Sequence, residues 1–153
     1  MIRGLTHNDT VECINLMNKY SFHAHYERDE AIWIKHFINH VIEYNKGNPH
    51  FLAIGDFDSD EYLNGFLIAG SFRNYYNESY VMDVKDCILE EEKFPARSAM
   101  RLFDAMIEHV KKHGGKHWRA DSIRDGHFGQ KYCEFLCKKY DAKLHHGVRG
   151  IIN

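Results

Sequence analysis

The fold is decided by residues 80–115, which read YVMDVKDCILEEEKFPARSAMRLFDAMIEHVKKHGG. Apolar and polar side chains mix along residues 80–89, which predicts a strand with one buried face. Pro95 suits the first turn of a helix, and three basic residues precede Gly114 and Gly115, a pattern typical of a helix C-terminus. An apolar stripe at helical spacing lies between these ends. Its members are Ala99, Phe103, Met106, Ile107 and Val110. The stretch therefore predicts a strand, a turn and a long helix.

The segments on either side of this stretch alternate between helical and strand patterns. The predicted order is a strand (2–5), two helices (6–20 and 29–44), a hairpin (50–57 and 62–72), the strand and helix above, a strand (117–122), a helix (128–140) and a final strand (142–152). The second helix carries an apolar stripe of Ile32, Trp33, Phe37, Val41 and Tyr44. This order predicts an α/β fold with a mixed sheet.

Strict alternation along residues 80–89 assigns each side chain to one face of the sheet. It places Met82, Val84, Asp86 and Ile88 on one face, and Val81, Asp83, Lys85, Cys87 and Leu89 on the other. The two carboxylates in this strand are therefore predicted to point to opposite sides.

The bulk composition suits one globular domain over residues 1–153, with 44% hydrophobic residues and a formal net charge of −2. That charge provides no general basic field for nucleic acid or an anionic membrane. The four cysteines form no CxxC pair, which favours a reducing cytoplasm. The 12 histidines and four cysteines show no zinc-type spacing, so no metal site is predicted.

The order of elements resembles that of the GNAT superfamily of N-acetyltransferases over essentially the whole chain. The family's most diagnostic segment is a strand, a turn of the form Gln/Arg-x-x-Gly-x-Gly/Ala and a long helix. Residues 93–98, Lys-Phe-Pro-Ala-Arg-Ser, fall in the place of that turn, with Ala96 and Ser98 where the glycines are expected. The resemblance implies a mixed, mostly antiparallel sheet with helices on both faces, and acetyl-CoA or another acyl-CoA as co-substrate.

A helix N-terminus offers unpaired backbone N–H groups and the positive end of the helix dipole, which suits a pyrophosphate. Small side chains let the phosphate approach the backbone, whereas Pro95 removes one donor. Glu90, Glu91 and Glu92 precede the turn as a solvated acidic run, which opposes anion binding. The residues expected to hold the cofactor are Ile88, Lys93, Ala96, Arg97, Ser98, Ala99, Met100 and Gln130.

A second family segment, roughly Asn-x-x-Ala-x-x-Phe-Tyr-x-Lys-x-Gly-Phe, resembles residues 130–142. The family's tyrosine, which often protonates the departing thiolate, falls on Cys137, or on Leu136 if the register slips by one. A thiol is a weak acid that could take this role, with Tyr132 or Tyr140 as alternatives on the same helix.

The reaction implied by the resemblance is direct attack of an amine on a thioester between two neighbouring parallel strands. A carboxylate helps to remove the proton of the amine. Asp83, Asp86 and Asp121 are candidates, and Asp86 is preferred because it lies nearer the turn that is expected to hold the cofactor.

Two other functions remain open at this point. The missing glycines and tyrosine would also fit a GNAT-fold module that binds or assembles without turnover. The basic stretch 111–119 is the one hint of a modifier of nucleic-acid or protein amines, although it also suits a helix C-terminus. The acceptor is expected to be a small molecule or peptide bound by loops 21–28 and 73–79. The sequence leaves a homodimer open and contains no apolar run of the roughly 20 residues that cross a membrane.

Overall fold

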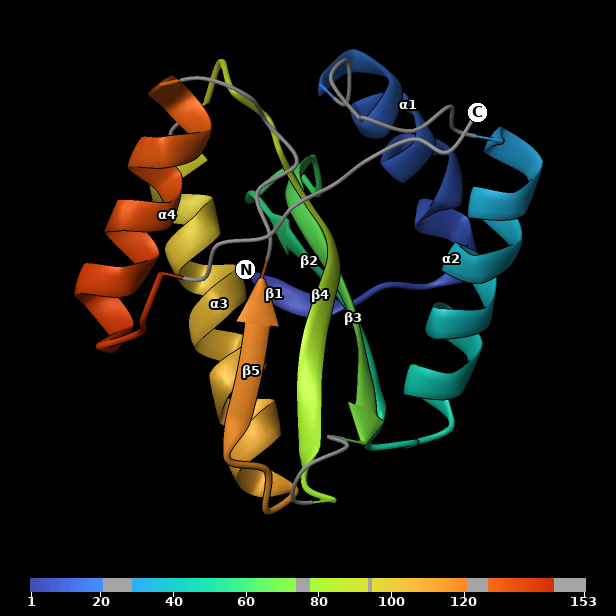
Figure 1. Cartoon of the computed structure of the whole chain (residues 1–153). Helices are drawn as coiled ribbons and strands as arrows, with labels where there is room; N and C mark the ends of the chain where they lie inside the picture. Colours follow the sequence, from blue (N-terminus) through green and yellow to red (C-terminus); the bar gives the residue numbers. More distant parts are fainter. Residues whose placement is uncertain (21–28, 74–77, 94, 121–126, 145–153) are drawn as a thin grey trace, which may run out of the picture. The chain divides into compact units, whose positions relative to one another are not determined.

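The computed structural model describes residues 1–20, 29–73, 78–93, 95–120 and 127–144, although not the side chains of 127–130 and 132. These residues fall into two compact units (Figure 1). The first unit contains the described residues as far as Ala120, and the second contains one helix, α4 (His127–Tyr140). The expectation of a single domain over 1–153 stays a prediction.

The first unit is built on a five-stranded sheet in the order β1-β2-β3-β4-β5. Neighbouring strands are antiparallel except for β4 and β5, which run parallel. The strands are β1 (Ile2–Gly4), β2 (Phe51–Phe57), β3 (Leu63–Arg73), β4 (Tyr80–Leu89) and β5 (His117–Ala120). The mixed, mostly antiparallel sheet that the resemblance implies is therefore confirmed.

Helices cover both faces of this sheet, as Figure 1 shows. They are α1 (Thr10–Tyr20), which a short 3₁₀ turn (His7–Asp9) precedes, α2 (Glu30–Asn45) and α3 (Pro95–Lys112). The face under α1 and α2 holds the main apolar cluster, to which Phe37, Phe66, Ile68 and Ile88 contribute. Trp33 and Tyr44 pack against that cluster as predicted, whereas Ile32 is 56% exposed and does not belong to the buried stripe of α2.

Local signals in the sequence fix the ends of the helices. The Asp29 side chain accepts a hydrogen bond from the backbone N–H of Ile32 at 3.1 Å and so caps α2. At the end of α3, Gly114 adopts a φ of 73°. Its N–H bonds to Lys111 and the N–H of Gly115 bonds to Val110, so the last carbonyl groups of the helix are satisfied.

A bulge in β4 overturns the predicted alternation of its side chains. Ile68 of β3 pairs with Asp86, whereas the next residue, Ala69, pairs with Val84, so Lys85 is an extra residue in β4. Gly70 then pairs with Asp83. Since Ile68 and Gly70 share a face, Asp83 and Asp86 lie on the same face of the sheet, the one that α1 and α2 cover.

Candidate active site

Asp86 occupies a fixed position beside the bulge of β4. Its Oδ2 accepts a hydrogen bond of 2.9 Å from the indole Nε1–H of Trp33 on α2. The indole ring stacks on Phe37 with 5.1 Å between the ring centroids, and Phe37 is buried. The aromatic pair therefore holds the indole in one orientation, and the indole in turn orients the carboxylate.

The described pairing of β4 with β5 lies just before this carboxylate along β4. Residues 81–84 of β4 pair with 117–120 of β5, and within the described chain residues 86–89 pair with β3 alone. Beyond the bulge, β4 continues for a few residues and enters the turn that begins α3. A carboxylate and a helix N-terminus are thus linked by one short segment of chain.

Asp83 has a different environment from Asp86, because it is almost buried between two cations. Its carboxylate pairs with the Arg119 Nε at 2.9 Å and with the Lys85 Nζ at 2.5 Å. Burial acts to raise the pKa of Asp83, but the hydrogen bonds from Arg119 and Lys85 outweigh it and hold the pKa below its ordinary value. Asp83 is therefore ionised and engaged in binding its neighbours, which suits a structural role.

The lowered pKa of Asp83 predicts a contribution to acid unfolding. A depressed pKa stabilises the fold above the pKa of the unfolded chain, about 3.9, and this stabilisation is lost as the pH falls through the folded value. Asp83→Asn is expected to lower the free energy of unfolding at pH 7 by about 1 to 3 kcal/mol. Urea titrations between pH 7 and 3 should show a flatter acid decline for the variant. An unchanged pH dependence would contradict this role.

The acidic run before α3 is partly neutralised by the end of α1. Tyr20 donates a hydrogen bond to Glu90, and the Lys19 Nζ lies 3.3 Å from Glu90 and 3.5 Å from Glu92. Burial raises the pKa of Glu90, but the hydrogen bonds from Tyr20 and Lys19 lower it below the ordinary value. Lys19 thus reduces the repulsion that these carboxylates exert on an anion at the turn.

The predicted cofactor residues fall into two groups. Ala96 and Arg97 lie exposed on the first turn of α3, and Lys93 lies exposed before it, 3.7 Å from Asp58. The side chains of Ile88, Ser98 and Ala99 are instead buried. In the described chain these three residues therefore offer little surface to a ligand, although Ser98 lines the hollow described below. Met100 is half-buried.

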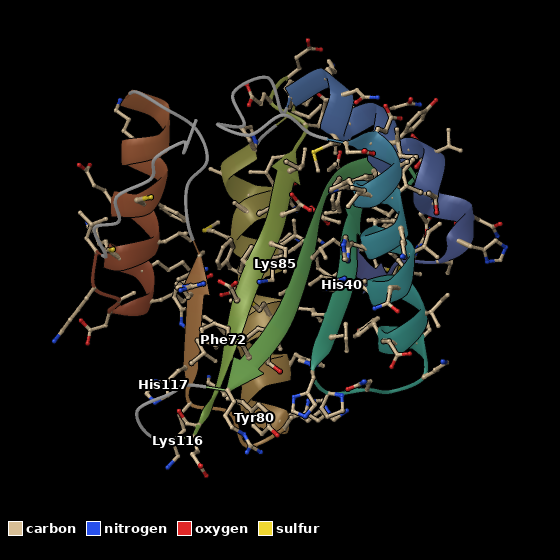
Figure 2. All side chains as sticks on the ribbon, turned by 45° about the vertical axis from the view of Figure 1, so that its right-hand side comes forward. His40, Phe72, Tyr80, Lys85, Lys116 and His117 are labelled. Atoms are coloured by element: carbon tan, nitrogen blue, oxygen red, sulfur yellow. The ribbon has the colours of Figure 1, made fainter. Side chains whose placement is uncertain are left out.

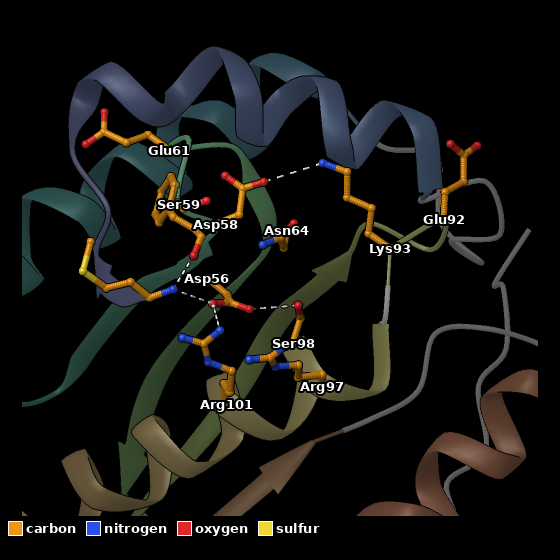
Figure 3. A pocket seen from close by; sticks show the side chains of 12 residues that line it. Asp56, Asp58, Ser59, Glu61, Asn64, Glu92, Lys93, Arg97, Ser98 and Arg101 are labelled. Carbon is orange, nitrogen blue, oxygen red and sulfur yellow. Dashed lines mark hydrogen bonds and ion pairs between the residues drawn. The ribbon is translucent and has the colours of Figure 1, made fainter.

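Ser98 faces β2 instead of solvent. Its hydroxyl donates to the buried Asp56 carboxylate at 2.9 Å, and the Arg101 guanidinium and the Met1 amino group lie 3.1 and 3.3 Å from the same carboxylate (Figure 3). Asp56 therefore anchors α3 to the sheet. A bulky residue at position 98 would disturb this contact before it tested any ligand site.

A hollow of about 840 Å³ lies over the Asp56 cluster (Figure 3). It is lined by the end of β2, the β2–β3 turn and one side of the start of α3, where Arg97 and Arg101 point toward it, together with Met1, Asn64 of β3 and the turn residues Glu92 and Lys93. No described residue of β4 or β5 lines this hollow. It is therefore separate from the stretch of β4 that carries Asp86.

Other sequence-predicted residues are not brought to this site. Cys137 lies on α4 in the second unit, so its proposed role as an acid stays a prediction. The side chains of Gln130 and Tyr132, together with Asp121 and loop 21–28, lie outside the described residues. Conversely, sequence reasoning missed Trp33 as the partner of Asp86. Its helical spacing indicated a buried position but not which strand residue its indole would contact.

The described residues contain neither a cluster of metal ligands nor a membrane-spanning helix. No group of three or more His, Cys, Asp or Glu side chains in them is arranged to hold a metal ion. None of the helices that the structure describes is both long enough and apolar enough for a membrane span. No disulfide bond joins the four cysteines, all of which lie in the described residues.

No protein-family model matches the chain, and neither does any curated protein sequence. Solved structures match it over its full length. A ribosomal-protein-alanine N-acetyltransferase from Brucella melitensis biovar Abortus has 16% identity and a TM-score of 0.70, covering 100% of this chain and 99% of its own. Glucosamine-6-phosphate N-acetyltransferase from Arabidopsis thaliana has 10% identity and a TM-score of 0.72, covering 100% and 98%. A transcriptional regulator from Bacillus halodurans has 15% identity and a TM-score of 0.73, covering 99% of each chain.

Proposed function

We propose, from the premise that this chain has the GNAT fold, that it transfers an acetyl or other acyl group from an acyl-CoA to an amine. The observation that carries the proposal is the position of Asp86. An oriented carboxylate lies beside the bulge of β4, on the strand that leads directly to the N-terminus of α3. The proposed base for the amine and the proposed site for the pyrophosphate of the acyl-CoA are thereby close together in the sequence.

The start of α3 fits the pyrophosphate of coenzyme A. The first N–H groups of a helix have no partner within the helix, and the helix dipole favours negative charge there. The exposed Ala96 leaves room for the ligand, and Arg97 and Lys93 add positive charge. Pro95 supplies no N–H, so the donors are those of the residues that follow it.

The chemistry at Asp86 follows from its fixed orientation. When bound, the acyl-CoA supplies a thioester carbonyl as the electrophile. An amine in water is mostly protonated near pH 7 and must lose a proton before it can attack. Asp86 would accept that proton directly or through one water. The indole N–H of Trp33 keeps the carboxylate aimed at the acceptor while this happens.

The role of Trp33 can be tested with a variant that keeps the packing. Trp33→Phe retains an aromatic ring against Phe37 but removes the indole N–H donor to Asp86. We expect the rate of acyl transfer to fall by about tenfold, because a misaligned base transfers protons less well. Steady-state rates from pH 6 to 9 provide the measurement. Trp118→Phe, which changes the other tryptophan, is the matched control, and equal rates for both variants would remove Trp33 from the mechanism.

A GNAT-fold module without turnover is the second candidate function. It is favoured by the departures from the family's turn, since Ala96 and Ser98 replace glycines and Pro95 removes a donor. One assay distinguishes the enzyme from the module without turnover. Acetyl-CoA is mixed with a panel of primary amines, and release of the free thiol is followed with a thiol reagent. Release that depends on both the amine and the protein supports the enzyme. Binding of coenzyme A without release supports the module.

A further inference from the structure

The face of the sheet that carries Asp86 also presents positive charge. Figure 2 shows this face with α3 behind the sheet. Lys85 is labelled on β4, and Phe72, Lys116 and His117 are labelled toward the lower end of the sheet. The side chains of Lys85 and Arg119 are 48% and 45% exposed, whereas that of Asp83 between them is only 8% exposed. A ligand that approaches this face therefore meets the two cations before it meets the carboxylate.

The two cations contact the same carboxylate. Lys85 and Arg119 each carry one positive charge and share the single carboxylate of Asp83. The shared carboxylate also fixes both cations in place, so that little side-chain entropy is lost when an anion binds to them.

An apolar surface lies next to the cations. The Arg119 guanidinium stacks over the ring of Phe72 at 5.0 Å from its centroid, and Phe72 is 39% exposed. Phe72 pairs with Val81 on β4, and Val81 in turn pairs with His117 on β5. Beyond the cations, the same face therefore continues toward an aromatic ring at the end of the sheet.

The register sets the distance between the proposed base and the cations. Asp83 and Asp86 are three positions apart on one face, with the bulged Lys85 between them. At about 3.3 Å per residue this is a separation of about 7 to 10 Å. If the amine of the acceptor lies at Asp86, a second group of the same molecule, about 7 to 10 Å from the amine, would lie beside Lys85 and Arg119.

We propose that the acceptor carries an anionic group, a carboxylate or a phosphate, which Lys85 and Arg119 bind while the amine lies at Asp86. The inference rests on the proposed function and adds the chemical class of the acceptor. Arg119 and Lys85 are then specificity-determining residues. Two cations held side by side suit the several oxygens of either anion.

Pairs of acceptors that differ in one charge test this inference. The probes are 6-aminohexanoate against its amide, and 4-aminobutyl phosphate against 4-aminobutanol. We expect kcat/KM to be about tenfold higher for at least one anionic member than for its neutral partner, and the preference to shrink with added salt. The probe pair with the larger ratio of kcat/KM shows whether the site prefers a carboxylate or a phosphate. A preference below about twofold in both pairs would overturn the inference.

Two charge-removing variants identify the residues responsible. Arg119→Gln and Lys85→Gln each leave Asp83 with one cationic partner, so the buried carboxylate stays paired and the fold should be kept. Each should lower the ratio of kcat/KM for the anionic over the neutral acceptor by about threefold or more. Lys111→Gln, which removes an exposed charge paired with Glu108 on α3, should leave the ratio unchanged. A ratio unchanged in all three variants would contradict the assignment.

Direct binding keeps the inference testable even without turnover. The same four probes are titrated into the protein in the presence of coenzyme A, with binding followed by calorimetry. Tighter binding of the anionic probes that Arg119→Gln weakens supports the inference, and equal or absent binding of all four overturns it. The proposed function is judged separately, by coenzyme A binding and thiol release. The two failures are therefore distinguishable.

Discussion

Replacing Asp86 with asparagine is expected to lower the rate of acyl transfer by about 100-fold or more, as the loss of a general base does. The amide has nearly the shape of the carboxylate and can still accept the hydrogen bond from Trp33. The packing around it should therefore survive. The affinity for coenzyme A should stay within a few fold, because Asp86 faces α2 and is not part of the turn that begins α3.

The pH dependence of this loss gives the sharper readout. Rates of the two proteins are compared from pH 6 to 9, and the deficit should be largest at low pH, where most of the amine is protonated and the need for a base is greatest. Asp104→Asn, which changes an exposed carboxylate on α3, is the control. Equal activity of Asp86→Asn and the unmodified protein across this range would exclude Asp86 as the base.

Replacing Ala96 with glutamate is expected to weaken coenzyme A binding by about 10- to 100-fold, because it places a carboxylate where the pyrophosphate should lie. Ala96 is exposed on the first turn of α3, so the larger side chain has room. Glutamate in a first turn is also favourable for the helix dipole, which means that the fold should not be weakened.

Ala96→Gln is the matched control for this second prediction, since it has the same shape without the charge. Calorimetric titration of the three proteins with coenzyme A separates the contributions of size and charge. Strong weakening by glutamate and little by glutamine locates the phosphates at this turn. Equal affinity in all three proteins would place the phosphates elsewhere.

Much of the fold could be predicted from local patterns in the sequence. The predicted 29–44 helix is observed as Glu30–Asn45 because Asp29 caps it, and the predicted end of α3 is confirmed because Gly114 takes up a left-handed conformation. The resemblance to the GNAT family is confirmed as a likeness of fold. These features depend on residues close together in the sequence, which is why pattern reasoning finds them.

The site was harder to predict because its geometry depends on contacts across the sheet. Alternation placed Asp83 and Asp86 on opposite faces, and the bulge at Lys85 makes that wrong. Nothing within β4 marks Lys85 as the extra residue, since the register of β3 is needed to see it. The Trp33–Asp86 and Ser98–Asp56 contacts join residues 53 and 42 positions apart, and no local pattern specifies either of them.

The most direct test of the account is calorimetric titration of the unmodified protein with acetyl-CoA and with coenzyme A. Because both ligands carry the same pyrophosphate, the account predicts that each binds saturably, at one molecule per chain and below millimolar concentration. It also predicts that added salt weakens both, as expected for an anion held by a helix N-terminus and nearby cations. No detectable binding of either ligand at millimolar concentration would contradict the claim that this chain uses an acyl-CoA.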